Sequence, residues 1–212
     1  MIDVDRLVSA FALKTPADSV RLYRDWARDY DETFAEAYGY IAPREVASTF
    51  RAEAARRPHL AVEPILDIGA GTGLLAAELA GMAVDAIDIS REMLDVAGAK
   101  GLYRRCILAD LTETLPIWDE TYSGFVSTGT FTHGHLGPCC LGELLRIARS
   151  GALFTLAINP GVFDDAGFGS AFAALVARDV IEPVDFHHLD IYEDARHAHA
   201  EDRYLTAVFR KR

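Results

Sequence analysis

Hydrophobic residues change their spacing once along the chain, at about residue 64. Before that point they recur every three or four positions, which predicts amphipathic helices with one aromatic face. The aromatic positions of this face are Tyr23, Trp26, Tyr30, Phe34 and Tyr38. Glycine and proline near residue 40 then introduce a second helix. This pattern predicts an N-terminal helical cover over residues 1–63 and one further domain over residues 64–212.

From residue 64 onward, short apolar runs alternate with helical stretches, and the runs are continuous rather than alternating in polarity. Strands buried on both faces have this composition, because helices cover both sides of a parallel sheet. The expected strands span residues 65–68, 84–89, 106–109, 124–127 and 152–158. Two later candidates, residues 185–192 and 203–210, follow one another without a helix between them, which favours antiparallel pairing. The expected class is α/β, mostly parallel with one reversed strand.

The composition is that of an ordinary globular protein, with 50% hydrophobic and 25% charged residues in 212. No apolar run approaches the roughly 20 residues of a membrane span, and the first residues are acidic where a secretion signal would be basic. The three cysteines, Cys106, Cys139 and Cys140, form no regular spacing. We therefore expect a cytoplasmic protein without a membrane partner.

The charge balance argues against nucleic acid as a partner. Lys and Arg number 21 against 32 Asp and Glu, which gives a net charge of −11. A surface this acidic repels phosphate backbones unless a local basic patch overrides it. The candidate patches are short, at residues 56–57, 104–105 and 210–212.

The most informative segment is residues 65–74, which reads as a strand, a glycine-rich loop and the start of a helix. Such a loop lets a ligand approach the backbone closely, with helix amides facing it. Dehydrogenases hold a pyrophosphate in this way. Here Asp67 precedes the first glycine, and its carboxylate would repel a pyrophosphate but attract an ammonium or sulfonium group.

Polar residues end four expected strands, at intervals of 21, 22 and 18 residues: Asp67, Asp88, Asp110 and Thr128. Ligands of open α/β sheets bind at this edge. Asp88 could accept hydrogen bonds from a ribose diol and Asp110 from an adenine amino group, with Ile89 and Leu111 on either side of the base. An adenosine with a positively charged amino-acid tail would satisfy all of these groups.

These residues resemble the class I S-adenosylmethionine-dependent methyltransferases. Residues 65–73 are similar to the first motif of that family, residues 87–90 with Met93 and Leu94 to the second, and residues 109–111 to the third. Residues 144–153 resemble its helix, turn and fifth strand, with Ser150-Gly151 where the family has a glycine pair. Shorter matches, at Tyr30-Asp31, residues 38–43 and residues 130–135, resemble the methyltransferase-like group named after the Williams-Beuren syndrome region.

The resemblance implies a Rossmann-like sheet of seven strands with the last one antiparallel, and helices on both faces. It also implies S-adenosylmethionine as cofactor and S-adenosylhomocysteine as product. The methionine part would lie among Asp67, Gly69, Gly71 and Gly73, with Trp26 or Tyr30 near its tail. The remaining cofactor contacts would come from Asp88, Ile89, Met93, Asp110, Leu111 and Thr128, the last near the sulfonium.

Each of these interpretations has an alternative. The glycine loop also fits a nicotinamide-dependent oxidoreductase, and a binding module could keep the pocket without catalysis. Asp110 could simply cap a turn, and Trp26 and Tyr30 could serve core packing alone.

Methyl transfer itself needs an aligned nucleophile and, for a hydroxyl or ammonium acceptor, a base. His133 and His135, after the fourth expected strand, are our candidates for binding the acceptor or taking its proton, although both could be structural. The segment 127–130 lacks the Asn-Pro-Pro-Tyr-like motif of DNA and protein-amide methyltransferases, which favours a small-molecule acceptor. No metal site is expected, because the adjacent His187 and His188 point to opposite faces of a strand.

Overall fold

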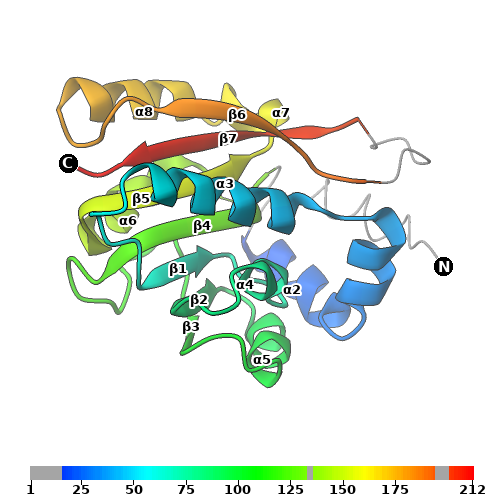
Figure 1. The fold of residues 1–212 in the computed structure, drawn as a ribbon. Coiled ribbons are helices and arrows are strands. Elements are labelled where there is room, and N and C mark those ends of the chain that lie inside the picture. The colour runs from blue at the N-terminus through cyan, green and yellow to red at the C-terminus, as the bar shows by residue number, and fades with distance from the viewer. Residues whose placement is uncertain (1–15, 133–135, 194–200) are drawn as a thin grey trace.

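The computed structural model describes residues 16–132, 136–193 and 201–212 (Figure 1). Within them, the strands form one seven-stranded sheet in the order β3-β2-β1-β4-β5-β7-β6. Its members are β1 (Ile65–Ile68), β2 (Val84–Asp88), β3 (Cys106–Leu108), β4 (Tyr122–Phe131), β5 (Ala148–Ile158), β6 (Asp185–Asp190) and β7 (Arg203–Arg210). β1 to β5 pair in parallel, whereas β7 is antiparallel to both β5 and β6. The expected fold class, including the reversed last strand, is confirmed.

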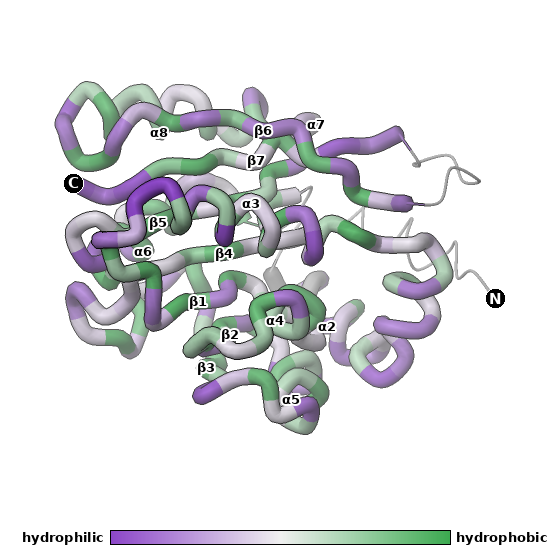
Figure 2. Tube along the Cα trace, viewed as in Figure 1, coloured by the Kyte–Doolittle hydropathy of each residue, from purple (hydrophilic) through white to green (hydrophobic). Residues whose placement is uncertain are grey.

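Helices cover both faces of this sheet. They are α2 (Pro16–Trp26), η1 (Asp31–Glu36), α3 (Ala42–Arg56), α4 (Leu74–Glu78), α5 (Arg91–Ala99), η2 (Pro138–Cys140), α6 (Leu141–Ile147), α7 (Pro160–Phe163) and α8 (Phe168–Ala177). Side chains of β1 alternate between two cores: Leu66 packs with α6 and α8, whereas Ile65 packs with α3 and α4. Figure 2 shows the hydrophobic residues along the central strands that both layers bury. None of the described helices is long and apolar enough to cross a bilayer.

The N-terminal segment differs from the expected continuous aromatic helix. α2 ends at Trp26, and after a turn the chain forms a six-residue π-helix, η1. The Thr33 hydroxyl donates to the Asp29 carbonyl at 2.7 Å and accepts from the Trp26 indole at 2.9 Å. These side-chain bonds hold the turn together, and such local competition is one way in which Thr interrupts a regular helix. Figure 1 shows this segment beyond the carboxyl ends of the parallel strands.

α3 belongs to the core of the sheet. Its Val46 and Phe50 are fully buried, in the same cluster as Ile65 of β1 and Val126 of β4. The helix lies across β4 and β5 in Figure 1. Residues 42–56 therefore share a hydrophobic core with the sheet, and Trp26 of α2 and Phe34 of η1 belong to the same cluster. The division of the chain at residue 63 stays a prediction.

β4 is longer than expected, because it continues beyond Thr128 to Phe131. Its pairing with β5 shifts register between Ser127 and Phe131, and Gly129 has a φ of 71° inside this irregularity. A bulge of this kind bends the strand and re-aims its side chains, and bulges are common next to functional sites. Thr128 thus lies within a distorted strand rather than at a strand end.

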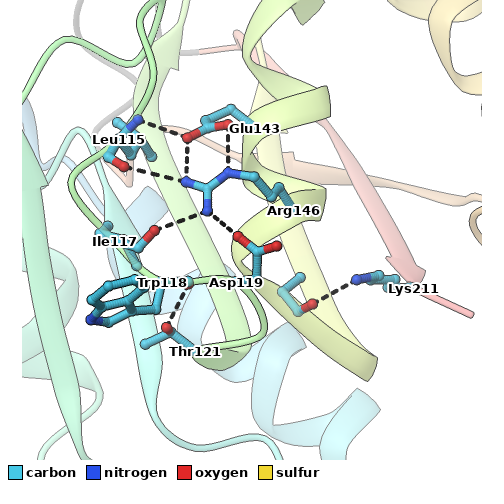
Figure 3. Close-up of polar contacts among 9 residues, drawn as sticks. Leu115, Ile117, Trp118, Asp119, Thr121, Glu143, Arg146 and Lys211 are labelled. Atoms are coloured by element: carbon cyan, nitrogen blue, oxygen red, sulfur yellow. Dashed lines mark hydrogen bonds and ion pairs between the residues drawn. The ribbon is translucent and has the colours of Figure 1, made fainter.

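The β3–β4 connection, residues 109–121, contains no helix, and Arg146 of α6 supports it instead (Figure 3). The Arg146 guanidinium donates to the carbonyls of Ile117 at 2.9 Å and Leu115 at 3.3 Å. Glu143 pairs with Arg146 and accepts from the Leu115 amide at 2.7 Å. Its pKa is lowered, mainly by the hydrogen bond from Arg146. One ion pair thus supplies the polar partners that this irregular backbone needs.

Candidate active site

The glycine-rich loop between β1 and α4 requires its glycines for two reasons. Gly69, Gly71 and Gly73 have φ values of 64°, 54° and 91°, a region that other residues rarely adopt. At Gly69 a Cβ would also lie 2.1 Å from the Thr130 hydroxyl oxygen. That hydroxyl donates to the Ile68 carbonyl at 2.8 Å and ties the bulge of β4 to the end of β1. The loop and the bulge therefore form one rigid wall.

This wall borders a cleft that opens to solvent. The glycine loop, the ends of β2 and β3, the β4 bulge and the N-terminal segment all contribute to it. Ten of the eleven residues predicted to bind the cofactor line it: Tyr30, Asp67, Gly69, Gly71, Asp88, Ile89, Met93, Asp110, Leu111 and Thr128. The fold thus brings together residues that lie more than 90 positions apart in the sequence.

Gly73 is the exception and lies outside the cleft lining. It is the N-cap residue of α4, although its neighbours Thr72 and Leu74 do line the cleft. A Cβ at this position would lie 3.1 Å from the Tyr103 ring. Gly73 therefore serves the close packing of the helix start against Tyr103.

Asp88, at the end of β2, is held by backbone amides on both sides. Gly71 N–H donates to its Oδ2 at 2.9 Å, and Ser90 N–H donates to its Oδ1 at 2.8 Å. Ser90 in turn caps α5 by accepting from the Met93 amide at 3.3 Å. Burial raises the pKa of the Asp88 carboxyl, against the opposing effect of these amides. Its position at the cleft is thus fixed, with lone pairs left for a ligand hydroxyl.

Asp67 is a carboxyl group that the protein buries, with no positive partner among the residues that the structure describes. It is 1% exposed, and Tyr103 O–H donates to its Oδ2 at 2.6 Å. Burial raises its pKa to about 7, opposed by the Tyr103 hydrogen bond. Within the described part of the chain, no ion pair to a lysine or arginine compensates it. A buried carboxylate beside a cleft favours a cationic ligand, as the ammonium of S-adenosylmethionine would be.

Aromatic side chains from the N-terminal segment form the opposite wall of the cleft. Tyr23, Tyr30 and Tyr40 line it. Trp26 does not, because it is 2% exposed and packs edge-on against Tyr30, with ring centroids 5.0 Å apart. Burial raises the pKa of all three cleft tyrosines, so they are neutral phenols at physiological pH. Trp26 thus serves core packing, whereas Tyr30 both packs in the core and lines the cleft.

Asp110 lines the cleft and also caps a turn. Its Oδ1 accepts from the Thr112 amide at 2.8 Å and from the Thr112 hydroxyl at 2.7 Å. The turn-capping interpretation is therefore realised, and it leaves the second carboxylate oxygen for a ligand.

His133 and His135 lie outside the described residues, as do His197 and His199. Thr130 and Leu136, on either side of the first pair, both line the cleft. Among the residues that the structure does describe, no group of three or more His, Cys, Asp or Glu side chains could hold a metal ion.

Sequence reasoning missed several residues of the site. Tyr40 and Tyr23 line the cleft, and the aromatic spacing that marked Tyr30 also included Tyr23. Tyr103 follows α5 in an irregular segment, and no local pattern marks it as the partner of Asp67. Asp31, beside Tyr30, hydrogen-bonds to the glycine loop at Thr72.

Comparisons with known proteins agree with this geometry. Residues 66–156 match the methyltransferase domain family. Human methyltransferase-like protein 27 is 34% identical over 155 residues, which are 71% of this chain and 62% of that protein. The chain thus spans less than two thirds of the length of this curated relative.

Solved structures share the fold. A TehB-like S-adenosylmethionine-dependent methyltransferase from Corynebacterium glutamicum superposes with a TM-score of 0.58 at 20% identity, covering 93% of this chain and 100% of that one. The [4+2]-cyclase SpnF superposes with a TM-score of 0.55 at 15% identity, covering 78% and 81%. The family match decides against the oxidoreductase alternative. Residues 66–156 therefore form a methyltransferase domain of the class I S-adenosylmethionine-dependent type, with S-adenosylmethionine as the cofactor, as the glycine loop and the strand-end carboxylates had indicated.

Proposed function

We propose that the protein transfers the methyl group of S-adenosylmethionine to a nitrogen, oxygen or sulfur nucleophile of a small molecule. The observation that carries the proposal is Asp67, a buried carboxyl beside the glycine loop of a methyltransferase domain, with no cationic partner in the described ranges of the chain. A positively charged cofactor would supply the charge that this site lacks.

S-adenosylmethionine, when bound, supplies an already activated methyl group, because its sulfonium sulfur leaves as the neutral thioether of S-adenosylhomocysteine. The tasks left to the chain are orientation and the exclusion of water. Asp67 would hold the ammonium group and Asp88 the ribose hydroxyls. Tyr23 and Tyr30 would close the cleft from the N-terminal side.

The acceptor would meet the cofactor at the β4 bulge. Thr128, Gly129 and Thr130 line the cleft there, and the Tyr40 hydroxyl hydrogen-bonds to Thr128. His133 and His135 follow this bulge in sequence, and our hypothesis that one of them binds the acceptor or takes its proton stands. Alanine substitution of each, assayed with an identified acceptor, tests it; unchanged turnover in both variants would remove it.

A small-molecule acceptor agrees with the charges of the site. Neither lysine nor arginine occurs among the described residues that line the cleft, and the chain carries a net charge of −11. Both features disfavour a phosphate-rich acceptor. A reducing, cytoplasmic location is part of the same proposal, since the three cysteines are free thiols.

The alternative is a protein that binds the cofactor without methyl transfer. The neighbour SpnF, which is described as a cyclase, illustrates that this fold serves other reactions. Saturable binding of S-adenosylmethionine, with no transfer of labelled methyl to a broad pool of acceptors, would favour this alternative.

Titration calorimetry with S-adenosylmethionine and S-adenosylhomocysteine tests the proposal. We expect saturable binding of both, and Asp88→Ala should weaken it by about tenfold to a hundredfold, because a charged hydrogen-bond acceptor is lost. Asp190→Ala, which removes an exposed carboxylate from β6, is the matched control and should bind like the parent. Folded protein that binds NADH but neither sulfur nucleoside would overturn the proposal.

A further inference from the structure

Asp31 joins three parts of the chain that lie far apart in sequence. The Thr72 hydroxyl donates to its Oδ1 at 2.5 Å, and the Lys100 ammonium pairs with its Oδ2 at 2.5 Å. These partners are 41 and 69 residues away. Both oxygens of one carboxylate are therefore used in tertiary contacts.

The partners of Asp31 lie on the opposite side of the cleft from the aromatic wall. Thr72 belongs to the glycine-rich loop, is 2% exposed and lines the cleft. Lys100 is the C-cap residue of α5, the helix that begins beside Asp88. Asp31 itself opens η1 and directly follows Tyr30, which lines the cleft from the other side. The carboxylate thus fastens the aromatic wall to the wall that carries the glycine loop.

The contacts of Asp31 are also partly shielded from solvent, which strengthens them. The Asp31 and Lys100 side chains are 33% and 30% exposed, so the ion pair is only partly screened by solvent. The hydrogen bond from Thr72 is made by a buried hydroxyl, and charge-assisted bonds of this type are the stronger ones.

We propose that Asp31 is a positioning residue whose contacts with Thr72 and Lys100 hold the aromatic wall over the cleft and thereby set the lifetime of the bound sulfur nucleoside. This inference rests on the proposed function, because it assumes that S-adenosylhomocysteine binds in the cleft. Opening of covering segments governs ligand release in many enzymes. The contact should therefore act on dissociation far more than on association.

The experiment measures release of tritiated S-adenosylhomocysteine from the full chain, by rapid filtration after a chase with excess unlabelled compound. Asp31→Ala should release it at least about tenfold faster, since both contacts are lost. Asp31→Asn keeps an acceptor for Thr72 but loses the charge facing Lys100. Asp31→Asn and Lys100→Met should each increase the release rate, by similar factors that are smaller than for Asp31→Ala. In both variants the release rate should depend less on salt concentration than in the parent.

A second readout follows the wall itself. The chain has two tryptophans: Trp26, which packs against Tyr30 behind the aromatic wall, and Trp118, which is 89% exposed. In a Trp118→Phe background, acrylamide quenching therefore reports on Trp26 alone. We expect Asp31→Ala to increase the quenching of Trp26 fluorescence. Bound S-adenosylhomocysteine should protect Trp26 from acrylamide in the parent, and it should protect Trp26 less in the Asp31→Ala variant.

The matched control is Asp190→Asn, which removes one charge from an exposed pair with Arg203 on β6 and β7. Release and quenching should both stay at parental values. Lys100→Met leaves the aromatic segment unchanged in sequence, so it tests the inference even if an Asp31 variant folds poorly. Parental release rates in Asp31→Ala and Lys100→Met would overturn the inference and leave the proposed function intact. Failure of the parent to bind S-adenosylhomocysteine would overturn both.

Discussion

We expect Asp67, the proposed partner of the cofactor's ammonium group, to make cofactor binding sensitive to pH in the neutral range. Burial raises its pKa to about 7, and only the ionised carboxylate attracts a cation. The ionised fraction rises roughly fifteenfold between pH 5.5 and 7, so the affinity for S-adenosylmethionine should rise by a similar factor. Calorimetry across this range checks it. Asp67→Asn should bind more weakly and show a flatter profile; an equally steep profile would assign the titration to another group.

The same residue should affect stability in the opposite direction. The folded state holds the Asp67 proton to higher pH than the unfolded state, whose value is near 3.8. The contribution of Asp67 to the free energy of unfolding should therefore fall as pH rises from about 4 to about 7. Denaturant titrations of the unliganded parent and of Asp67→Asn separate this contribution from those of other carboxyls.

At the scale of single residues, sequence reasoning placed side chains at the cleft where the fold fixes their position, and their part in binding the cofactor stays a prediction. Asp67 and Asp88 follow from the rule that ligands bind at the carboxyl ends of parallel strands. Tyr103 and Asp31 could not be found in this way, because their contacts with Asp67 and Thr72 cross 36 and 41 residues of the sequence. Local patterns encode elements, but they do not encode which loop folds back onto which.

The packing of β4 against the segment before β1 leaves no room for a side chain at Gly124. A Cβ there would lie 2.4 Å from the Val62 carbonyl oxygen and 2.8 Å from the Phe50 ring. Gly124→Ala should therefore cost about 2–3 kcal/mol and lower the melting temperature by about 5–10 °C, measured by calorimetry.

Gly142→Ala provides the comparison. Gly142 is in α6, and a Cβ there would meet nothing within 4 Å. This substitution should stabilise the protein by about 0.5–1 kcal/mol, as expected for glycine in a helix. A melting temperature of Gly124→Ala within a degree of the parent would mean that β4 can move away from Val62.

At the scale of elements, periodicity predicted the strands of the sheet well, because buried parallel strands carry an unambiguous composition. It failed at two places where polar side chains rearrange the backbone. Thr33 accompanies the break between α2 and η1, and Thr130 anchors the bulge that lengthens β4. In each case a tertiary or side-chain hydrogen bond replaces a regular one, and hydrophobic spacing carries no signal for it.

The charge of the whole molecule leads to a prediction about partners. With a net charge of −11, the chain should not retard transfer RNA or duplex DNA in gel-shift assays at about 150 mM salt. The isolated chain and the chain saturated with S-adenosylhomocysteine should behave alike. Tight binding with a steep dependence on salt would contradict the proposal of a small-molecule acceptor and point to a nucleic acid.

The position of β7 in the sheet determines when β5 and β6 can pair during synthesis of the chain. β7 pairs with β5 on one side and with β6 on the other, although it follows both in sequence. Until the ribosome has made residues 203–210, β5 is an open edge of the sheet, and β6 has no neighbouring strand. Residues 152–158 of β5, which are all buried in the folded protein, lie along this open edge. At about 5–20 residues per second this interval lasts on the order of seconds. An exposed apolar edge recruits other strands, so the nascent chain is most vulnerable to aggregation just before β7 emerges.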